Sequence, residues 1–284
     1  MGRRLFIFGY GFTGAALARR LRPEGWSVAG TSRTDEGRAA LAAKGIEPVD
    51  PADPAALRQA VSTADALLIA APPADDGCPG FNALARFLVA GTPAWTGYLS
   101  TTGVYGDRGG GWVFEDSELA ARSQEGARRV AAERGWLQLG RDLGLTVTVF
   151  RLPGIYGPGR SPFDRLERGV RMNKPGHVFS RIHVDDLAAG LAASIARPRA
   201  GGIYNLCDDA PASPSVVNAY AASLAGIALP PEQPWDEALL SPAARRFYAE
   251  SKRVSNARAK AELGWRPAYP NYREGLAAIW TVRT

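Results

Sequence analysis

The sequence predicts an α/β protein, a doubly wound parallel sheet with a smaller, mostly helical C-terminal lobe. Three observations lead to this prediction. Short apolar segments alternate with amphipathic segments up to residue 156, a glycine-rich turn follows the first apolar segment, and proline, glycine and arginine interrupt the alternation beyond Gly157. Strands that alternate with helices form parallel βαβ units, and helices then cover both faces of the sheet.

The individual elements are predicted from apolar periodicity and from turn and cap residues. The helix at 53–63 has the clearest start, because Asp53 is a favourable N-cap and Pro54 fits the first helical position. Strands are expected at 5–10, 26–33, 46–50, 64–73, 94–106, 145–153 and 202–209. Helices are expected at 15–25, 35–45, 53–63, 82–91, 119–140, 182–198, 213–226 and 241–250, and the segment 256–282 closes a lobe that is mostly helical.

The first predicted strand leads into the segment LFIFGYGFTG, which contains the spacing G-x-G-x-x-G before a helix. Glycine permits a tight turn at the strand end, lets a pyrophosphate approach the backbone and lets the helix pack close to the sheet. The helix N-terminus adds unpaired N–H groups and the positive end of a dipole. This context predicts a dinucleotide-binding loop made of Gly9, Tyr10, Gly11, Phe12, Thr13 and Gly14.

The composition argues against several other classes of protein. No apolar stretch approaches the ~20 residues that span a membrane, so a cytoplasmic protein is expected. Two distant cysteines, Cys78 and Cys207, suggest no disulfide framework, and two histidines provide no zinc-ligand cluster. The net charge of +6 arises from arginines interleaved with acids, which favours a small-molecule substrate over a nucleic-acid partner.

Four further segments occur in an order that is typical of one family. They are STTGVYG at the fifth strand, RLPGIYGPGR after the sixth, RIHVDDLA, and ELGWRPAYPNYREGL near the C-terminus. With the glycine loop, the chain resembles an extended short-chain dehydrogenase/reductase of the NAD-dependent epimerase/dehydratase type. The loop is one residue shorter than the G-x-x-G-x-x-G usual in these epimerases, which indicates an atypical member. Such proteins often dimerise, so a homodimer is possible.

The resemblance implies how the chain is divided. Residues 1–156 would form a dinucleotide-binding Rossmann domain, completed by residues 178–208. Residues 157–177 and 209–284 would form the lobe that caps the substrate. That lobe carries no motif from which the substrate can be identified.

The end of the second strand bears on the choice of cofactor. It runs into Ser32 and Arg33, with no acid before Asp35. An arginine here accommodates a 2′-phosphate, whereas an acid would bind the ribose hydroxyls, so NADP(H) is predicted, with NAD(H) as second choice. Asp50 matches the aspartate that lies near the adenine in the family, although it could equally be a turn cap. Along the cofactor, small residues are expected at Ala70, Ala71 and Pro72.

The resemblance also assigns the candidate catalytic positions, and here the chain departs from the family. The Ser/Thr role falls on Thr101, with Ser100 expected beside the cofactor. The family's Tyr-x-x-x-Lys positions fall on Glu125 and Arg129, and no tyrosine occurs between Tyr105 and Tyr156. Arginine stays protonated and cannot relay a proton. Glu125 is either a base of raised pKa or an ordinary solvated helix carboxylate, and the second reading is favoured.

Two segments of the second half are assigned by the same resemblance. Pro153, Gly154 and Ile155 are expected to border the nicotinamide, in a place where nucleotide-sugar epimerases usually have asparagine. The arginine that these epimerases carry before Ile-His-Val is replaced here by the sequence Phe-Ser-Arg at 179–181. In the segment that follows, Asp185 or Asp186 is expected to cap a helix, and His183 to be a buried structural histidine.

Three functional hypotheses follow. The first is an NADP(H)-dependent oxidoreductase or epimerase/dehydratase-like enzyme that acts on a small or sugar-like carbonyl or hydroxyl compound. The second is a dinucleotide-binding redox sensor or regulator without turnover, because the Tyr-x-x-x-Lys pair is missing. The third is a nucleotide-sugar epimerase. Every departure of this chain from the family pattern described above argues against it.

Overall fold

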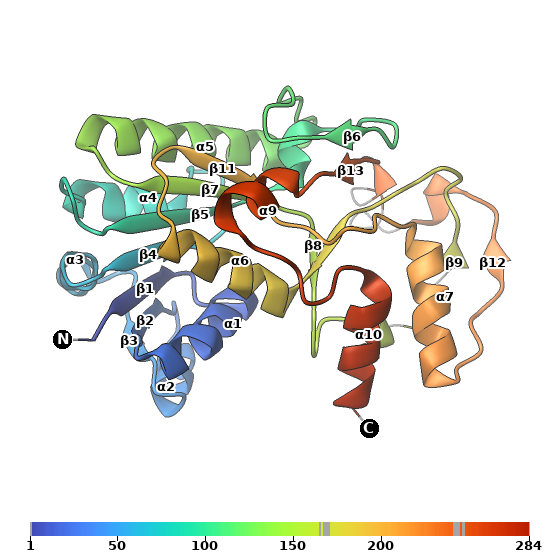
Figure 1. The fold of residues 1–284 in the computed structure, drawn as a ribbon, viewed down its shortest axis with the longest axis horizontal. Coiled ribbons are helices and arrows are strands. Elements are labelled where there is room, and N and C mark those ends of the chain that lie inside the picture. Colours follow the sequence, from blue (N-terminus) through green and yellow to red (C-terminus); the bar gives the residue numbers. More distant parts are fainter. Residues whose placement is uncertain (1, 165, 167–170, 241–244, 246–247, 284) are drawn as a thin grey trace.

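A seven-stranded sheet forms the larger part of the molecule in the computed structural model, and a smaller lobe adjoins it (Figure 1). The structure describes residues 2–164, 166, 171–240, 245 and 248–283. The strand order is β11-β7-β5-β4-β1-β2-β3 and every neighbouring pair is parallel, which confirms the predicted fold class. Its strands are β1 (Arg4–Phe8), β2 (Ser27–Thr31), β3 (Glu47–Val49), β4 (Ala66–Ile69), β5 (Trp95–Thr101), β7 (Val147–Leu152) and β11 (Gly202–Asn205).

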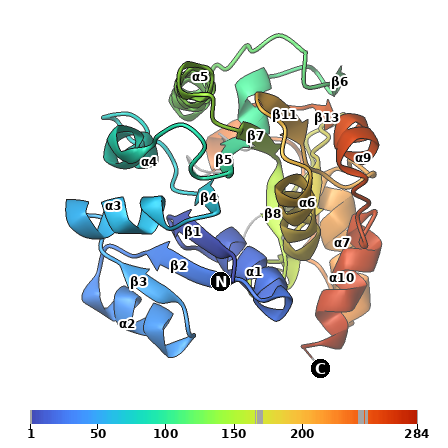
Figure 2. The ribbon, with the colours of Figure 1, turned by 60° about the vertical axis from the view of Figure 1, so that its left-hand side comes forward.

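Helices cover both faces of this sheet (Figure 2). On β1, Leu5 and Ile7 point into one apolar core and Phe6 and Phe8 into the other, as the alternation of side chains in a strand requires. The first core contains residues of α1 (Phe12–Leu21), α2 (Asp35–Ala43) and α6 (Val184–Ala196). The second contains residues of α3 (Pro54–Ser62), α4 (Pro79–Leu84) and α5 (Gln124–Leu143).

The direction of the chain across the sheet reverses at β1. From β1 the chain proceeds to β2 and β3, and then returns to β4 on the other side of β1. The last residues of these two strands, Phe8 and Ile69, are register partners, so both strands end at the same level. In open α/β sheets, ligands bind outside the carboxyl ends of the strands at such a switch point.

The lobe is built from helices and three pairs of short parallel strands. Its apolar core joins α7 (Pro214–Ala225) and α10 (Tyr272–Thr281) through residues such as Val217 and Leu276. The strand pairs are β8 (Gly154–Tyr156) with β10 (Arg181–His183), β9 (Arg171–Met172) with β12 (Glu232–Gln233), and β6 (Trp112–Val113) with β13 (Arg253–Val254). The described part of the chain also contains the helix α9 (Ala257–Leu263) and, in both the lobe and the sheet domain, the 3₁₀ turns Arg22–Glu24, Ala85–Phe87, Thr102–Tyr105, Pro162–Asp164 and Glu237–Leu239.

Several predicted boundaries need correction. The helix expected at 82–91 begins earlier, with Pro79 at its first position, and ends at Leu84, where the backbone tightens into a 3₁₀ turn. The helix expected at 119–140 begins later, because the Ser123 side chain accepts a hydrogen bond from the Gly126 N–H and caps it. The strand expected at 94–106 ends at Thr101. The helix expected at 241–250 falls largely outside the described residues.

The predicted cap of α6 was also wrong. The His183 Nδ1 atom accepts a hydrogen bond from the Asp185 N–H at 3.2 Å, so the histidine and neither aspartate caps this helix. The Asp186 carboxylate instead accepts hydrogen bonds from the backbone N–H groups of Ala268 and Tyr269, at 2.6 and 3.0 Å. It thereby anchors the C-terminal segment on α6. In contrast, the predicted Asp53 cap of α3 is confirmed.

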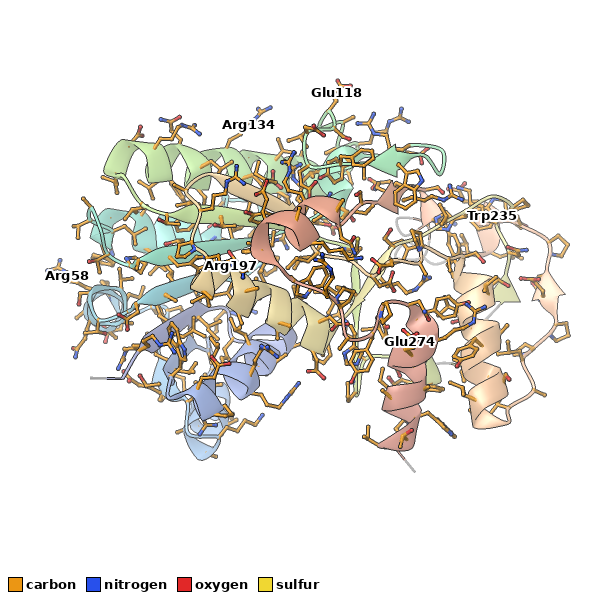
Figure 3. The ribbon with its side chains drawn as sticks, in the orientation of Figure 1. Arg58, Glu118, Arg134, Arg197, Trp235 and Glu274 are labelled. Atoms are coloured by element: carbon orange, nitrogen blue, oxygen red, sulfur yellow. The ribbon has the colours of Figure 1, made fainter. Side chains whose placement is uncertain are left out.

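Charged side chains are spread over the surface. Arg58 on α3 and Arg134 on α5 point outward from different parts of the molecule (Figure 3). Among the described residues, no helix has an apolar stretch long enough to cross a membrane.

Candidate functional site

The glycine loop after β1 is held between the ends of two neighbouring strands. Gly9 has φ +90°, and an ideal Cβ on it would lie 2.5 Å from the Ala71 nitrogen, so only glycine fits this turn. On the other side, the Gly9 N–H donates to the Thr31 Oγ1 atom at 2.8 Å, and the Tyr10 N–H donates to the Thr31 carbonyl. Thr31 was not among the predicted site residues, although it lies near the end of the strand predicted at 26–33 and is the last residue of β2.

The N-terminus of α1 is open towards the switch point. Gly11 occupies the N-cap, no side chain caps the helix, and its first turn contains no acidic residue. An ideal Cβ on Gly11 would have only the Gly9 carbonyl oxygen within reach, at 4.0 Å, whereas one on Gly14 would lie 3.1 Å from Ile7. The backbone is therefore accessible at Gly11, and the helix packs closely on the sheet at Gly14. These residues fit the diphosphate of a dinucleotide.

Two arginines in different environments lie near the carboxyl end of β2, Arg33 in the segment that follows the strand and Arg38 on α2. Arg33 is exposed and forms no ion pair or side-chain hydrogen bond with any described residue. Arg38 is held in place: it donates to the Ser32 carbonyl at 3.0 Å, pairs with Asp35, and lies 3.4 Å from the Asp50 carboxylate. The sequence reasoning missed Arg38, although a second basic residue five positions after Arg33 was visible.

The backbone of the turn after β4 packs against the glycine loop. The N–H groups of Ala70 and Ala71 both donate to the Phe8 carbonyl, at 2.9 and 3.1 Å. An ideal Cβ on Gly9 would lie 2.5–2.9 Å from the nitrogen, Cα and Cβ atoms of Ala71, so the two backbones are in close contact here. Asp50 lies further along the same edge and also accepts a hydrogen bond from the Ala52 N–H at 2.8 Å, as a turn residue does.

The end of β5 presents Thr101 and encloses Ser100. Thr101 is partly exposed, and its Oγ1 atom accepts a hydrogen bond from the Gly103 N–H at 3.1 Å. Ser100 is 5% exposed and donates its hydroxyl hydrogen to the Glu133 carboxylate at 2.5 Å. Only the first of these two side chains is thus accessible from the carboxyl edge of the sheet.

The first turns of α5 lie beside this strand end. An ideal Cβ on Gly126 would lie 3.0 Å from the Gly103 carbonyl oxygen, so the helix start packs directly on the turn after Thr101. Arg129 is partly buried and donates to the Leu99 carbonyl. Glu125 is exposed and has no ion pair within the described part of the chain. Its environment matches the favoured reading, a solvated helix carboxylate.

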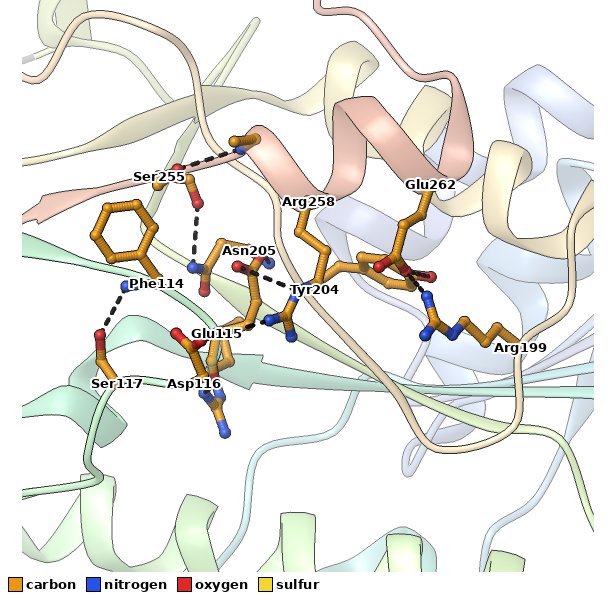
Figure 4. Close-up of polar contacts among 12 residues, drawn as sticks. Phe114, Glu115, Asp116, Ser117, Arg199, Tyr204, Asn205, Ser255, Arg258 and Glu262 are labelled. Atoms are coloured by element: carbon orange, nitrogen blue, oxygen red, sulfur yellow. Dashed lines mark hydrogen bonds and ion pairs between the residues drawn. The ribbon is translucent and has the colours of Figure 1, made fainter.

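A buried polar network connects α5 to the sheet. The Arg151 guanidinium lies 2.9 Å from the Glu133 carboxylate, and both side chains are almost fully buried. Arg151 also donates to the Tyr105 hydroxyl at 3.0 Å, and Tyr105 donates to the Asn205 side chain at 2.7 Å. The Asn205 backbone N–H in turn donates to the Glu115 carboxylate at 2.9 Å (Figure 4).

This network excludes Tyr105 as a replacement for the missing tyrosine. Its side chain is fully buried, burial raises its pKa to about 12, and its hydroxyl already has a donor and an acceptor partner. Among the described residues, no group of three or more His, Cys, Asp or Glu side chains is placed to hold a metal ion. The accessible side chains at the end of β5 are therefore those of Thr101 and its neighbours on α5.

The predicted nicotinamide border lies on β8, and an aromatic ring covers it. Pro153, Gly154 and Ile155 are all partly exposed. An ideal Cβ on Gly154 would lie 2.4 Å from the Phe179 ring, so the ring occupies the space of a side chain at this position. Arg181 is buried beneath the ring, with its guanidinium 5.5 Å from the ring centroid and hydrogen-bonded to the Phe179 carbonyl.

A second buried polar cluster lies behind this border, around Asp208. Asp208 is 1% exposed, and its Oδ2 atom has no hydrogen-bond partner among the described residues. Burial raises its pKa to about 7, against the opposing effect of the Arg181 charge. The hydroxyl of buried Tyr156 also lacks a hydrogen-bond partner among the described residues.

His183 is buried and its ring contacts the rings of Tyr156 and Tyr269. Burial lowers the pKa of His183, an environment that fits the predicted structural histidine.

Comparison with known proteins identifies the family. No family model matches the chain. Protein YeeZ from Escherichia coli K12 is 32% identical over 228 residues, which span 75% of this chain and 80% of YeeZ. The chain belongs to the YeeZ family.

Solved structures share the fold of this chain. A functionally unknown conserved protein from Silicibacter pomeroyi DSS is 46% identical, with a TM-score of 0.90 over 100% of this chain and 99% of its own. The dTDP-glucose 4,6-dehydratase from Bacillus anthracis, solved with NAD, has a TM-score of 0.79 over 98% and 96% of the two chains at 16% identity. This member of the YeeZ family therefore has the fold of the NAD-dependent epimerases and dehydratases, which confirms the resemblance inferred from its motifs.

Replacement of Arg151 by methionine tests the buried network. We expect Arg151→Met to lower the free energy of unfolding by about 3–5 kcal/mol, because it leaves the Glu133 carboxylate buried without its counter-ion. Combining it with Glu133→Leu should recover much of this loss. Urea unfolding measures both, with Arg141→Met on the exposed side of α5 as control. If the single and the double variant lost equal amounts of unfolding free energy, Arg151 would not be the counter-ion that stabilises the buried Glu133 carboxylate.

The pKa of Asp208 predicts a pH-dependent stability. Its pKa lies above the usual aspartate value in the folded state, so the unfolded chain loses this proton first as the pH rises, and stability falls between about pH 4 and pH 7. Asp208→Asn keeps an acceptor for the Ala210 N–H and removes this loss. The variant should be more stable than the wild type at pH 8, by up to about 4 kcal/mol, and similar at pH 4. Urea unfolding at both pH values checks this; destabilisation at pH 8 would refute it.

Proposed function

We propose that this protein is an NADP(H)-binding oxidoreductase, or an epimerase/dehydratase-like enzyme, that acts on a small or sugar-like carbonyl or hydroxyl compound. One observation carries the proposal: the uncapped N-terminus of α1, with an accessible backbone at Gly11, opens at the switch point of the sheet. Backbone N–H groups and a helix dipole directed at one point favour an anion there. The relatives of known activity that share this fold support a nicotinamide dinucleotide as that anion.

The residues along the carboxyl edge would hold the parts of the cofactor in order. The diphosphate would bind the N–H groups at the start of α1. At the adenosine end, Arg33 favours NADP(H), because its guanidinium has no carboxylate partner among the described residues and is free to bind a 2′-phosphate. Arg38 holds the Ser32 carbonyl and the Asp50 carboxylate beside it. A bound nicotinamide would supply hydride transfer at the other end of the edge.

At the nicotinamide end, Thr101 would hold the substrate oxygen. Its hydroxyl remains able to donate, since its only described hydrogen bond is one that it accepts. Arg129 would add positive charge at the start of α5. The substrate is expected to be small, because the Phe179 ring fills the space above Gly154 and Arg181 is buried beneath it. The same two features argue against a nucleotide sugar.

A second function, a dinucleotide-binding sensor without turnover, is favoured by one observation. At the two family positions of the Tyr-x-x-x-Lys pair, Glu125 points to solvent and Arg129 is hydrogen-bonded to the Leu99 carbonyl. Neither side chain is placed as a proton donor. Binding and turnover therefore have to be measured separately.

Binding is tested by titrating the purified protein with NADPH and with NADH and following the fluorescence of the reduced nicotinamide. We expect NADPH to bind at least about tenfold more tightly, through charge-assisted hydrogen bonds to Arg33. Arg33→Ala should remove this preference and leave NADH binding unchanged, whereas Arg134→Ala on the outer face of α5 should change neither. Equally weak binding of both dinucleotides to the wild type would refute the proposal.

Turnover separates the enzyme from the sensor. If the protein is an enzyme, a screen of small carbonyl compounds should reveal one that oxidises NADPH, and Thr101→Val should reduce kcat for it by about 10²-fold or more, since a donor to the reacting oxygen is lost. Thr101→Ser retains the hydroxyl and serves as the matched control. Full turnover by Thr101→Val would exclude Thr101 from the mechanism. Tight NADPH binding without turnover of any compound would favour the sensor.

A further inference from the structure

We propose that Arg160, in the turn that leads from the sheet into the lobe, is a cofactor-binding residue that contacts the diphosphate of the dinucleotide. This inference rests on the proposed function, because it requires the dinucleotide at the start of α1. It extends that function by one residue that lies outside the carboxyl edge of the seven-stranded sheet, in the segment 157–177.

The turn that carries Arg160 has a defined shape. The Gly157 N–H donates to the Arg160 carbonyl at 3.1 Å, and the Arg160 N–H donates to the Gly157 carbonyl at 3.0 Å. Between them, Gly159 has φ +74°, a conformation that residues with a side chain rarely adopt. These two hydrogen bonds fix the position of the Arg160 backbone.

The turn is packed directly on the start of α1. An ideal Cβ on Gly157 would lie 2.7 Å from Val184 and 3.1 Å from the Phe12 ring, so glycine is needed for this close approach. Phe12 is the first residue of α1 and belongs to the glycine loop. The turn of the lobe and the predicted diphosphate site are therefore neighbours in space, although they are far apart in the sequence.

The Arg160 side chain lies over this junction and is available to a ligand. Its guanidinium is 5.7 Å from the centroid of the Phe12 ring, and the residue is exposed. It forms no hydrogen bond or ion pair through its side chain with any residue that the structure describes. By contrast, Arg19 near the other end of α1 pairs with Asp185.

A diphosphate at the start of α1 matches this guanidinium in charge and geometry. The planar fork of arginine binds phosphate oxygens in pairs, and contact with an aromatic face orients it without neutralising it. The positive end of the α1 dipole would attract the same anion. Phe12 would thus hold Arg160 beside the phosphates, and the lobe would contribute directly to cofactor binding.

Probes with and without the diphosphate test this assignment. Dissociation constants of NADPH, ADP-ribose and adenosine 2′-monophosphate are measured by calorimetry for the wild type, Arg160→Ala and Arg160→Lys. We expect Arg160→Ala to weaken NADPH and ADP-ribose by roughly tenfold, and to leave adenosine 2′-monophosphate unchanged because it has no diphosphate. Arg160→Lys should recover part of the loss. The Arg58→Ala variant, which changes an exposed arginine in the middle of α3, should bind every probe as the wild type does.

The outcomes distinguish the two proposals. If the wild type binds NADPH and ADP-ribose and Arg160→Ala binds them equally well, the inference on Arg160 is overturned while the proposed function stands. An equal loss for all three probes would indicate a general disturbance of the site and would also overturn it. If the wild type binds no dinucleotide, the proposed function itself fails. Thermal unfolding of each variant shows that the fold is retained.

Discussion

The buried ion pair between Glu133 and Arg151 is the interaction on which the rest of the site depends. Burying two charges costs several kcal/mol each, so such a pair is tolerated only when its remaining donors and acceptors are bonded. Here Ser100, Tyr105 and the Glu115 backbone supply those bonds. The pair, together with Ser100, thereby joins the long helix α5 to two central strands of the sheet. The carboxyl ends of β5 and β7 are held in place relative to each other and to α5.

The buried network limits which side chains are available for chemistry at the carboxyl edge of the sheet. Ser100 and Tyr105 belong to the motif that suggested catalysis, yet both side chains are used to satisfy buried charge. Thr101, one residue further along β5, is the hydroxyl that stays accessible. Its neighbours on α5 are a solvated carboxylate and an arginine bound to the backbone. The predicted dinucleotide loop is thus well formed. In contrast, the tyrosine that donates a proton in the epimerases and dehydratases is replaced by Glu125 at the matching position.

Close backbone approach recurs at the points where the lobe and the sheet meet the proposed cofactor. Gly9 lies against the turn after β4, Gly154 lies under the Phe179 ring, and Gly157 lies on Phe12. At each position a Cβ would collide with a neighbour. Glycine is therefore needed for the backbone to lie this close to the neighbouring group. At Gly154 and Gly157 an aromatic ring, of Phe179 and of Phe12 respectively, is among the groups that occupy the space of a side chain.

The sequence by itself determined the fold class, the position of the glycine turn before α1 and the cap of α3, because these depend on periodicity and on residues a few positions apart. Only the tertiary structure decided which side chains are accessible. Ser100 meets Glu133, His183 rather than an aspartate caps α6, and Arg160 reaches Phe12. The cap of α6 is a local contact, but the segment offers one histidine and two aspartates, and only the backbone conformation shows which of them caps the helix. The other two contacts join residues tens of positions apart, and no local pattern encodes them. They are set by the register of the strands and by the packing of helices on the sheet.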